Sequence, residues 1–97
     1  HYAPSAPVRL FDAAGLAAAW AALDDAARST VAVYSHAAPP GALRFRRMPG
    51  DAAAVAHELF AVLRAFDDAG ARQIWVERPP AGPDWDGVND RLQRAST

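Results

Sequence analysis

The side chains with the clearest chemical potential stand where short apolar runs end. Asp12, His36, Glu77 and Arg78 each lie at or just after the end of a predicted buried strand. In a parallel sheet, ligands favour the crevice beyond the carboxyl ends of the strands. These four residues therefore form a candidate ligand-binding or interdomain crevice. A simple ion pair between Glu77 and Arg78 is the plainer interpretation of those two residues.

The histidines do not have the spacing of a metal site. His1, His36 and His57 are far apart in the sequence. His57-Glu58 begins like a zinc-protease helix, but the residue four positions after His57 is alanine, so a second ligand is missing. Ser35 and His36 are adjacent, and side chains of adjacent strand residues point to opposite faces, so they do not form a nucleophile and base. We expect no metal site and no catalytic residue.

The composition excludes further kinds of chemistry. The 97 residues include ten basic residues, all of them arginine, and no cysteine. A P-loop lysine, a Schiff-base lysine, a thiolate nucleophile and a disulfide are therefore impossible. The glycine patterns of phosphate loops and of the serine-hydrolase turn are also missing. The formal net charge of -1 provides no long-range attraction to nucleic acid or to an anionic membrane.

Two kinds of charged cluster allow both a functional and a structural interpretation. The run Arg44–Arg47 could contact RNA, but its one aromatic residue alternates inward and provides no stacking platform, so we expect a solvated strand face and no direct nucleic-acid binding. The pairs Asp24–Asp25 and Asp67–Asp68 are predicted at helix C-termini, where the helix dipole disfavours carboxylates. Such pairs sometimes mark metal or acid–base sites, and more often they are tolerated exposed residues.

Helical and strand-like segments alternate along the chain. The predicted strands are residues 8–11, 30–34, 43–47 and 73–77. The first predicted helix begins at Asp12 or Gly15 and ends at about residue 27. The second covers about residues 52–69, with Asp51 as its N-cap and Gly70 after its end, and the third is capped by Asp84. This order favours a three-layer α/β/α sandwich around a mostly parallel sheet of four to five strands. Leu43 and Phe45 are expected to face inward from an edge strand, and Trp75 to lie in the core.

One connection in this scheme is short for a parallel sheet. A parallel crossover usually needs a dozen or more residues, and few residues separate Tyr34 from Leu43. Either the chain crosses as a taut loop or these two strands are antiparallel. We favour the taut loop.

His1 and Tyr2 are predicted to project from the folded body as an extended arm. Residues 1–7 are assigned to an interdomain linker, because Pro4 and Pro7 favour an extended path, and residues 8–97 are assigned to a single domain. The longest apolar run, residues 13–23, is shorter than the ~20 residues of a membrane span. With no signal-peptide pattern, the chain is expected to be cytoplasmic and to make no membrane contact.

Five segments together resemble the C-terminal domain of threonylcarbamoyl-AMP synthases. These segments are His1–Pro4, Glu58–Asp67, Ile74–Glu77, Pro79–Pro80 and Asp90–Ala95. The second of them, Glu-Leu-Phe-Ala-Val-Leu-Arg-Ala-Phe-Asp, is similar to the family's helix, which reads roughly Leu-Phe-x-x-Leu-Arg-x-x-Asp. The segments follow the family's order and spacing and cover essentially the whole chain. The connection at residues 36–41 is shorter than in longer family members.

The resemblance implies a Rossmann-like fold and an accessory role. In such synthases a YrdC-like catalytic domain, joined in cis, uses ATP with Mg²⁺, L-threonine and bicarbonate to make threonylcarbamoyl-AMP, which serves the modification of tRNA adenosine 37. The substrate-binding residues belong to that catalytic domain, so no cofactor is expected on this chain. Only His1 and Tyr2 map to the linker segment that lies across the nucleotide cleft in the family.

Two functional interpretations remain open at this point. The chain can be an accessory or regulatory C-terminal domain that holds the linker over the active site. Alternatively, it is a free-standing small-ligand-binding domain that uses the strand-end crevice. An independent enzyme has no supporting set of residues, and the sequence does not indicate an oligomeric state.

Overall fold

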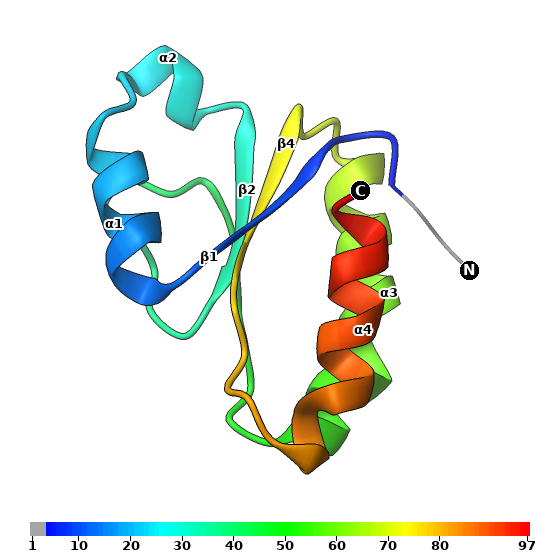
Figure 1. Cartoon of the computed structure of the whole chain (residues 1–97). Coiled ribbons are helices and arrows are strands. Elements are labelled where there is room, and N and C mark those ends of the chain that lie inside the picture. Colours follow the sequence, from blue (N-terminus) through cyan, green and yellow to red (C-terminus); the bar gives the residue numbers. More distant parts are fainter. Residues whose placement is uncertain (1–3) are drawn as a thin grey trace.

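A computed structural model describes residues 4–97 and shows a parallel sheet covered by helices on both faces (Figure 1). The strands are β1 (Val8–Phe11), β2 (Val31–Ser35), β3 (Arg44–Arg47) and β4 (Gln73–Glu77), in the order β1-β4-β2-β3, and every neighbouring pair is parallel. The helices are α1 (Ala13–Ala21) and α2 (Asp25–Arg28) on one side of the sheet and α3 (Ala52–Asp68) and α4 (Asp86–Ala95) on the other. The Rossmann-like three-layer α/β/α prediction is confirmed, with four strands.

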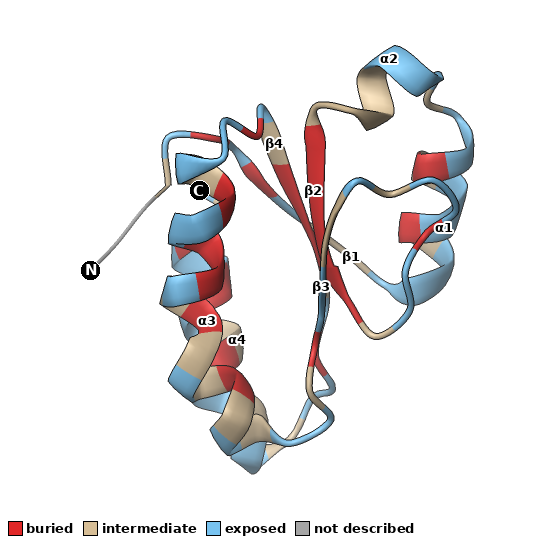
Figure 2. Ribbon diagram, turned by 180° about the vertical axis from the view of Figure 1, so that it is seen from behind, coloured by how far each residue is buried: buried red, intermediate tan, exposed pale blue. Residues whose placement is uncertain are grey.

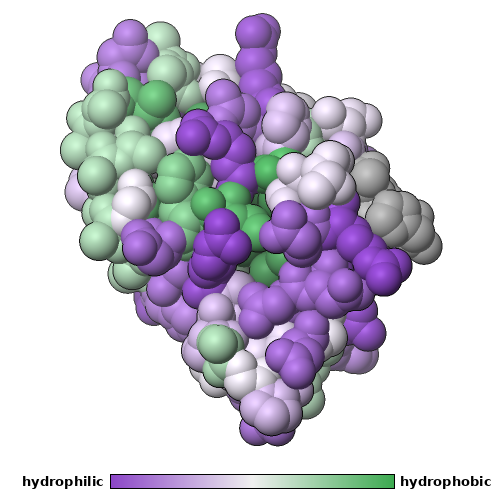
Figure 3. Space-filling model, in the orientation of Figure 1, coloured by the Kyte–Doolittle hydropathy of each residue, from purple (hydrophilic) through white to green (hydrophobic). Residues whose placement is uncertain are grey.

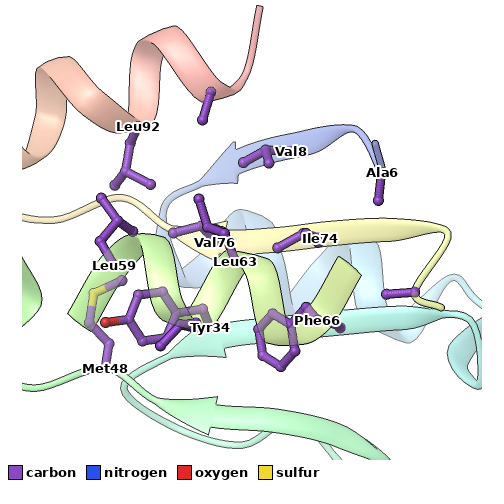
Figure 4. Packing of buried hydrophobic residues seen from close by; sticks show 14 of the residues in the cluster. Ala6, Val8, Tyr34, Met48, Leu59, Leu63, Phe66, Ile74, Val76 and Leu92 are labelled. Carbon is purple, nitrogen blue, oxygen red and sulfur yellow. The ribbon is translucent and has the colours of Figure 1, made fainter. Parts of the chain in front are cut away.

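The central strands β2 and β4 are buried because helices cover both of their faces (Figure 2). Successive side chains of a strand point to opposite faces, so these two strands supply two separate cores. The core on the α3 and α4 side includes Tyr34, Ile74 and Val76, and Figure 4 shows Leu59 of α3 and Leu92 of α4 packed around Val76. The core on the α1 side contains Leu16, Trp20, Val31, Val33 and Trp75. Trp75 is 2% exposed, which confirms its predicted place in the core.

The short connection between β2 and β3 runs as a taut loop alongside α1 (Figure 2). Its path is fixed by a hydrogen bond from Trp20 Nε1 to the Pro40 carbonyl oxygen and by a turn in which the Ala42 amide donates to the Pro39 carbonyl. β2 and β3 are parallel, so the taut loop is confirmed and the antiparallel alternative is wrong. Packing against α1 replaces the crossover helix that such a connection usually contains.

The edge strand β3 begins one residue later than predicted, so Leu43 lies outside it. Leu43 precedes β3 and is 75% exposed, so the prediction that it faces inward is wrong. Because it belongs to the loop, the alternation of the strand does not apply to it. Phe45, inside β3, packs against the α1-side core as expected.

The segment predicted as the first helix forms two helices, and the acidic pair Asp24–Asp25 therefore lies at a different helix end from the one predicted. α1 ends at Ala21, and Asp24 then adopts an extended backbone whose carboxylate accepts from the Ala27 amide at 2.8 Å. Asp24 therefore caps the N-terminus of α2, and Asp25 lies in its first turn, where the dipole favours a negative charge. The prediction that this pair lies at a helix C-terminus is wrong.

The boundaries of the later helices are set by local signals. The Asp51 carboxylate accepts from the Ala54 amide and caps α3, and Gly70 follows this helix with a positive φ of 84°. α4 begins at Asp86, after a 3₁₀ turn at Pro83–Trp85, so the predicted Asp84 cap is wrong. Its inward residues include Val88 and Leu92, as expected. Within residues 4–97, every helix is too short or too polar to cross a bilayer.

Candidate functional site

His36 and Glu77, two of the four predicted crevice residues, meet at the carboxyl ends of β2 and β4. His36 Nδ1 lies 3.1 Å from Glu77 Oε2, and the His36 backbone amide donates to Glu77 Oε1 at 3.1 Å. The Glu77 side chain is only 18% exposed. The polar partner of Glu77 is therefore His36, and the plainer interpretation, a pair with Arg78, is wrong.

Asp12 and Arg78 lie at the same edge of the sheet but have structural roles. Asp12 Oδ1 accepts from the Gly15 amide at 2.6 Å, so Asp12, and not Gly15, caps α1. The Arg78 amide donates to the Phe11 carbonyl at 2.6 Å and extends the contact of β4 with β1. The Arg78 side chain is exposed. Neither residue contributes to the cleft that opens beside Glu77.

A cleft of about 450 Å³ lies between α1 and the loop that follows β2. Its lining residues are Ala13, Leu16, Ala17, Trp20, Ala21, Arg28, Ser35, Ala37, Ala38, Pro39, Pro40 and Glu77. Ser35 and Glu77 are the last residues of β2 and β4, so the cleft opens at the strand ends. Figure 3 shows mainly apolar (green) residues over α1, the helix that forms one wall of the cleft. The cleft is a mainly apolar slot with its polar groups at two ends.

The polar groups at the two ends of the cleft are bonded differently. Ser35 is 1% exposed, and its Oγ donates to the Ala37 carbonyl at 2.8 Å. At the other end, the Arg28 guanidinium donates to the carbonyl oxygens of Trp20 and Ala21, at the last turn of α1. It also lies 5.8 Å from the centre of the Trp20 ring and pairs with Asp25 at 3.5 Å. Arg28 is therefore the cap for the carboxyl end of α1.

The arginine run of β3 bonds to the domain itself. Arg44 donates to the Ser29 carbonyl, and Arg47 donates to the His36 carbonyl at 2.7 Å. Arg46 pairs at 3.1 Å with Glu58, which also accepts from the Tyr34 hydroxyl at 2.7 Å. Burial, together with this bond to Glu58, raises the pKa of Tyr34. These contacts give Arg44, Arg46 and Arg47 structural roles within the domain.

The N-terminal segment is bound to the end of α3 by one carboxylate. Asp67 Oδ2 accepts from the Ser5 amide at 3.0 Å, and Asp67 Oδ1 accepts from the Ala6 amide at 3.1 Å. Ala6 is 6% exposed, and the Pro7 carbonyl accepts from the Ile74 amide at 2.9 Å. Predicted contact residues His1 and Tyr2 lie outside the described residues. We call the two hydrogen bonds from the Ser5 and Ala6 amides to the Asp67 carboxylate the linker clasp.

Sequence reasoning missed the residues that shape these two features. It singled out Asp67 as a carboxylate at an unfavourable helix end, and that was the only signal of the linker clasp. Nothing in the sequence indicated that Ser35 lines a cleft or that alanines and prolines form its walls. His57 is exposed on α3, as expected for a helix-surface residue, and the part of the chain that the structure describes brings no three His, Asp or Glu residues together for a metal.

Comparison with known proteins gives one match. The family model described as threonylcarbamoyl-AMP synthase, C-terminal domain, matches residues 1–97, the whole chain. No curated protein and no solved structure matched. The match agrees with the parallel α/β fold and with the resemblance of the five segments in the sequence. The chain therefore belongs to the family of threonylcarbamoyl-AMP synthase C-terminal domains.

Proposed function

We propose that this domain is a non-catalytic accessory module that anchors the interdomain linker of a threonylcarbamoyl-AMP synthase. The beginning of the linker, with His1 and Tyr2, would be held over the nucleotide cleft of a YrdC-like catalytic domain in cis. That catalytic domain would convert ATP, L-threonine and bicarbonate to threonylcarbamoyl-AMP for tRNA modification, in the cytoplasm. The observation that carries the proposal is the linker clasp.

The linker clasp supports this role because it fixes the direction in which the chain enters the domain. Two N–H groups on consecutive residues bind the two oxygens of one carboxylate, so Ser5 and Ala6 are held in one orientation. Hydrogen bonds to an ionised acceptor are stronger than neutral ones. Pro4 and Pro7 flank the clasped residues and restrict the backbone on both sides. A segment that is already ordered loses little entropy when it docks.

The roles of the residues beyond the clasp follow from their chemistry. Tyr2 offers an aromatic ring and a hydroxyl, and His1 offers a charge that changes near neutral pH, and both suit contact with a nucleotide or its phosphates. The described residues provide no cluster of carboxylates or histidines that fits Mg²⁺. We therefore assign ATP and Mg²⁺ to the catalytic domain and no reaction step to this one.

The test compares two neighbouring acids in the full-length synthase. Asp67→Ala removes both acceptors of the linker clasp, whereas Asp68→Ala removes an exposed carboxylate on the same helix end. We expect Asp67→Ala to speed amide hydrogen exchange at Ser5 and Ala6 and to lower threonylcarbamoyl-AMP synthesis several-fold. Asp68→Ala should leave both unchanged. Tyr2→Ala should lower synthesis at least tenfold, which is ~1.4 kcal/mol of transition-state stabilisation.

Circular dichroism and the melting temperature would establish that each variant keeps a folded domain. Full synthesis in both Asp67→Ala and Tyr2→Ala, with the domain folded, would overturn the proposal, because the linker would then be only a tether. A loss of synthesis in Asp68→Ala as large as in Asp67→Ala would also contradict it, since the effect would then come from charge at the helix end.

A second function, small-ligand binding at the strand ends, is favoured by the cleft beside Glu77. The cleft lies in the same molecule but does not include Asp67 or residues 4–7. Binding there would be compatible with an accessory role, in which the ligand regulates the enzyme. It would be equally compatible with a domain that acts on its own.

A further inference from the structure

We propose that the cleft between α1 and residues 37–40 binds a small organic cation, a primary amine with an apolar body, through the carboxylate of Glu77. The inference does not depend on the linker proposal, because Asp67 and residues 4–7 are not part of the cleft. It rests on three observations. These are the position of the cleft in the sheet, the polar groups that remain available in it, and its apolar walls.

The cleft lies where the sheet topology creates a crevice. The chain leaves β1 and β2 toward the α1 side, through α1 and through the loop beside it, and leaves β4 toward α4 on the opposite side. β4 lies between β1 and β2 in the sheet, so connections diverge on either side of it. Ligands of open α/β sheets bind at such switch points, beyond the carboxyl ends of the strands. Glu77, at the end of β4, lines this crevice.

The Ser35 and Glu77 side chains in the cleft can still accept hydrogen bonds. Each oxygen of the Glu77 carboxylate has one polar contact from His36, and a carboxylate oxygen can accept two hydrogen bonds. Ser35 Oγ already donates to the Ala37 carbonyl, so it is left as an acceptor. A ligand that binds to these two residues must donate, and an ammonium group donates three hydrogen bonds.

Charge also favours a cation at this end of the cleft. The Glu77 side chain is 18% exposed, and a partly buried charge attracts a counter-charge more strongly than one in water. The positive group at the other end, Arg28, is engaged with the carbonyls of Trp20 and Ala21 and with Asp25. Its donors serve the end of α1, so an anionic ligand would have to compete for them.

The walls of the cleft determine the body of the ligand. Apart from Arg28, Ser35 and Glu77, the lining side chains are alanine, proline, leucine and tryptophan. A cleft of about 450 Å³ is within the ~300–1,000 Å³ range of small-molecule sites. An aromatic or branched aliphatic group fits such walls, and Ala17 on α1 and Ala38 in the loop leave room for it.

Three probes with nearly the same body and different heads test the proposal. We would titrate 2-phenylethylamine (cation), 2-phenylethanol (neutral) and 3-phenylpropionate (anion) into the ¹⁵N-labelled chain and follow the Trp20 indole and the Ser35 and Glu77 amides. We expect the amine to bind most tightly and to shift these three signals. Glu77→Gln should weaken amine binding about tenfold, or ~1.4 kcal/mol, and leave 2-phenylethanol binding unchanged.

Two matched variants, in which an alanine of α1 is replaced by phenylalanine, control for the position of binding. Ala17→Phe places a ring in the cleft and should abolish binding of all three probes. Ala18→Phe adds the same ring to the same helix at a position that does not line the cleft, and it should bind like the wild type. The backbone amide spectrum of each variant reports whether it is folded.

Several results would overturn the proposal. Tighter binding of the anion would make Arg28 the recognition group. Equal affinity of the amine for the wild type and Glu77→Gln, or undiminished binding to Ala17→Phe, would place the amine elsewhere. The absence of shifts at Trp20, Ser35 and Glu77 with any probe up to its solubility limit would mean that the cleft binds none of them.

Discussion

The indole N–H of Trp20 donates a 2.7 Å hydrogen bond to the carbonyl oxygen of Pro40. This bond joins α1 to the loop that connects β2 with β3, and it stabilises a parallel connection that has no helix. Trp20 is 2% exposed, so the loop is attached to a side chain of the core. The same two residues line opposite walls of the cleft. The width of the cleft therefore depends on this hydrogen bond.

Trp20→Phe keeps an aromatic ring in the core and removes the donor. We expect a loss of ~1 kcal/mol in the free energy of unfolding, typical for one hydrogen bond. Hydrogen exchange at the Ala42 amide, which donates to the Pro39 carbonyl, should become faster. Urea unfolding gives the change in the free energy of unfolding, and NMR gives the exchange rate of the Ala42 amide. Unchanged exchange at Ala42 would show that the loop holds its path without the Trp20 bond.

Trp75→Ala should strongly destabilise the domain. Trp75 is 2% exposed and contacts the rings of Phe11 and Trp20, at centroid distances of 4.9 and 6.0 Å. Loss of a buried aromatic side chain costs ~3–5 kcal/mol, which is close to the whole stability of a domain of this size. Trp85→Ala, at a half-buried position, is the control and should cost less. A Trp75→Ala variant that melts within a few degrees of wild type would contradict the two-sided burial of β4.

The Tyr34 phenol makes the stability of the domain sensitive to alkaline pH. Burial raises the pKa of Tyr34, and the hydrogen bond to Glu58 acts in the same direction. Above pH ~10 the phenol ionises in the unfolded chain and stays protonated in the folded one. The folded state then binds more protons, so stability falls as the pH rises. Below pH ~10 the phenol is protonated in both states, so Tyr34 makes its full contribution to the stability of the domain.

The measurement compares the wild type with Tyr34→Phe in urea at pH 8 and pH 11. Between these values the wild type should lose ~1.4 kcal/mol more stability than Tyr34→Phe, the amount expected for one proton over one pH unit. Equal losses in the two proteins would mean that the phenol ionises as readily in the folded state as in the unfolded chain.

Asp24→Ala tests the corrected position of the first acidic pair. The variant loses the cap on α2 and should be less stable by ~1 kcal/mol. Asp68→Ala is the contrast, because Asp68 is an exposed residue at the C-terminal end of α3, where a negative charge is unfavourable. We expect that variant to be as stable as the wild type or slightly more so. Thermal melts of the two variants in low salt suffice, and equal destabilisation of both would be inconsistent with a cap at Asp24.

The purified 97-residue chain should not release pyrophosphate from ATP. The chain has no lysine, no cysteine and no phosphate loop with which to bind and polarise the nucleotide. The assay contains ATP, Mg²⁺, L-threonine and bicarbonate, with a matched blank without protein. Release that depends on threonine and bicarbonate would assign catalysis to this domain.

The elements of the fold could be predicted from the sequence because their signals are local. β-branched runs marked β2 and β4, an Asp followed by an apolar stripe marked α3, and Gly70 marked its end. The whole-chain resemblance rested on similar short segments. Errors occurred where two local signals compete. Asp24 interrupts a continuous alanine-rich stretch and starts a new helix, and Pro83 introduces a 3₁₀ turn before α4.

The candidate sites were decided by the tertiary structure. The sequence brought Glu77 and His36 to the same edge of the sheet, but 41 residues separate them, and only the parallel pairing of β2 with β4 makes them partners. Asp67 meets Ser5 and Ala6 over an even longer separation. The cleft walls are alanines and prolines, which carry no chemical signal of their own. Their arrangement depends on how α1 packs beside the loop, and a sequence encodes such long-range packing only through the sum of many weak contacts.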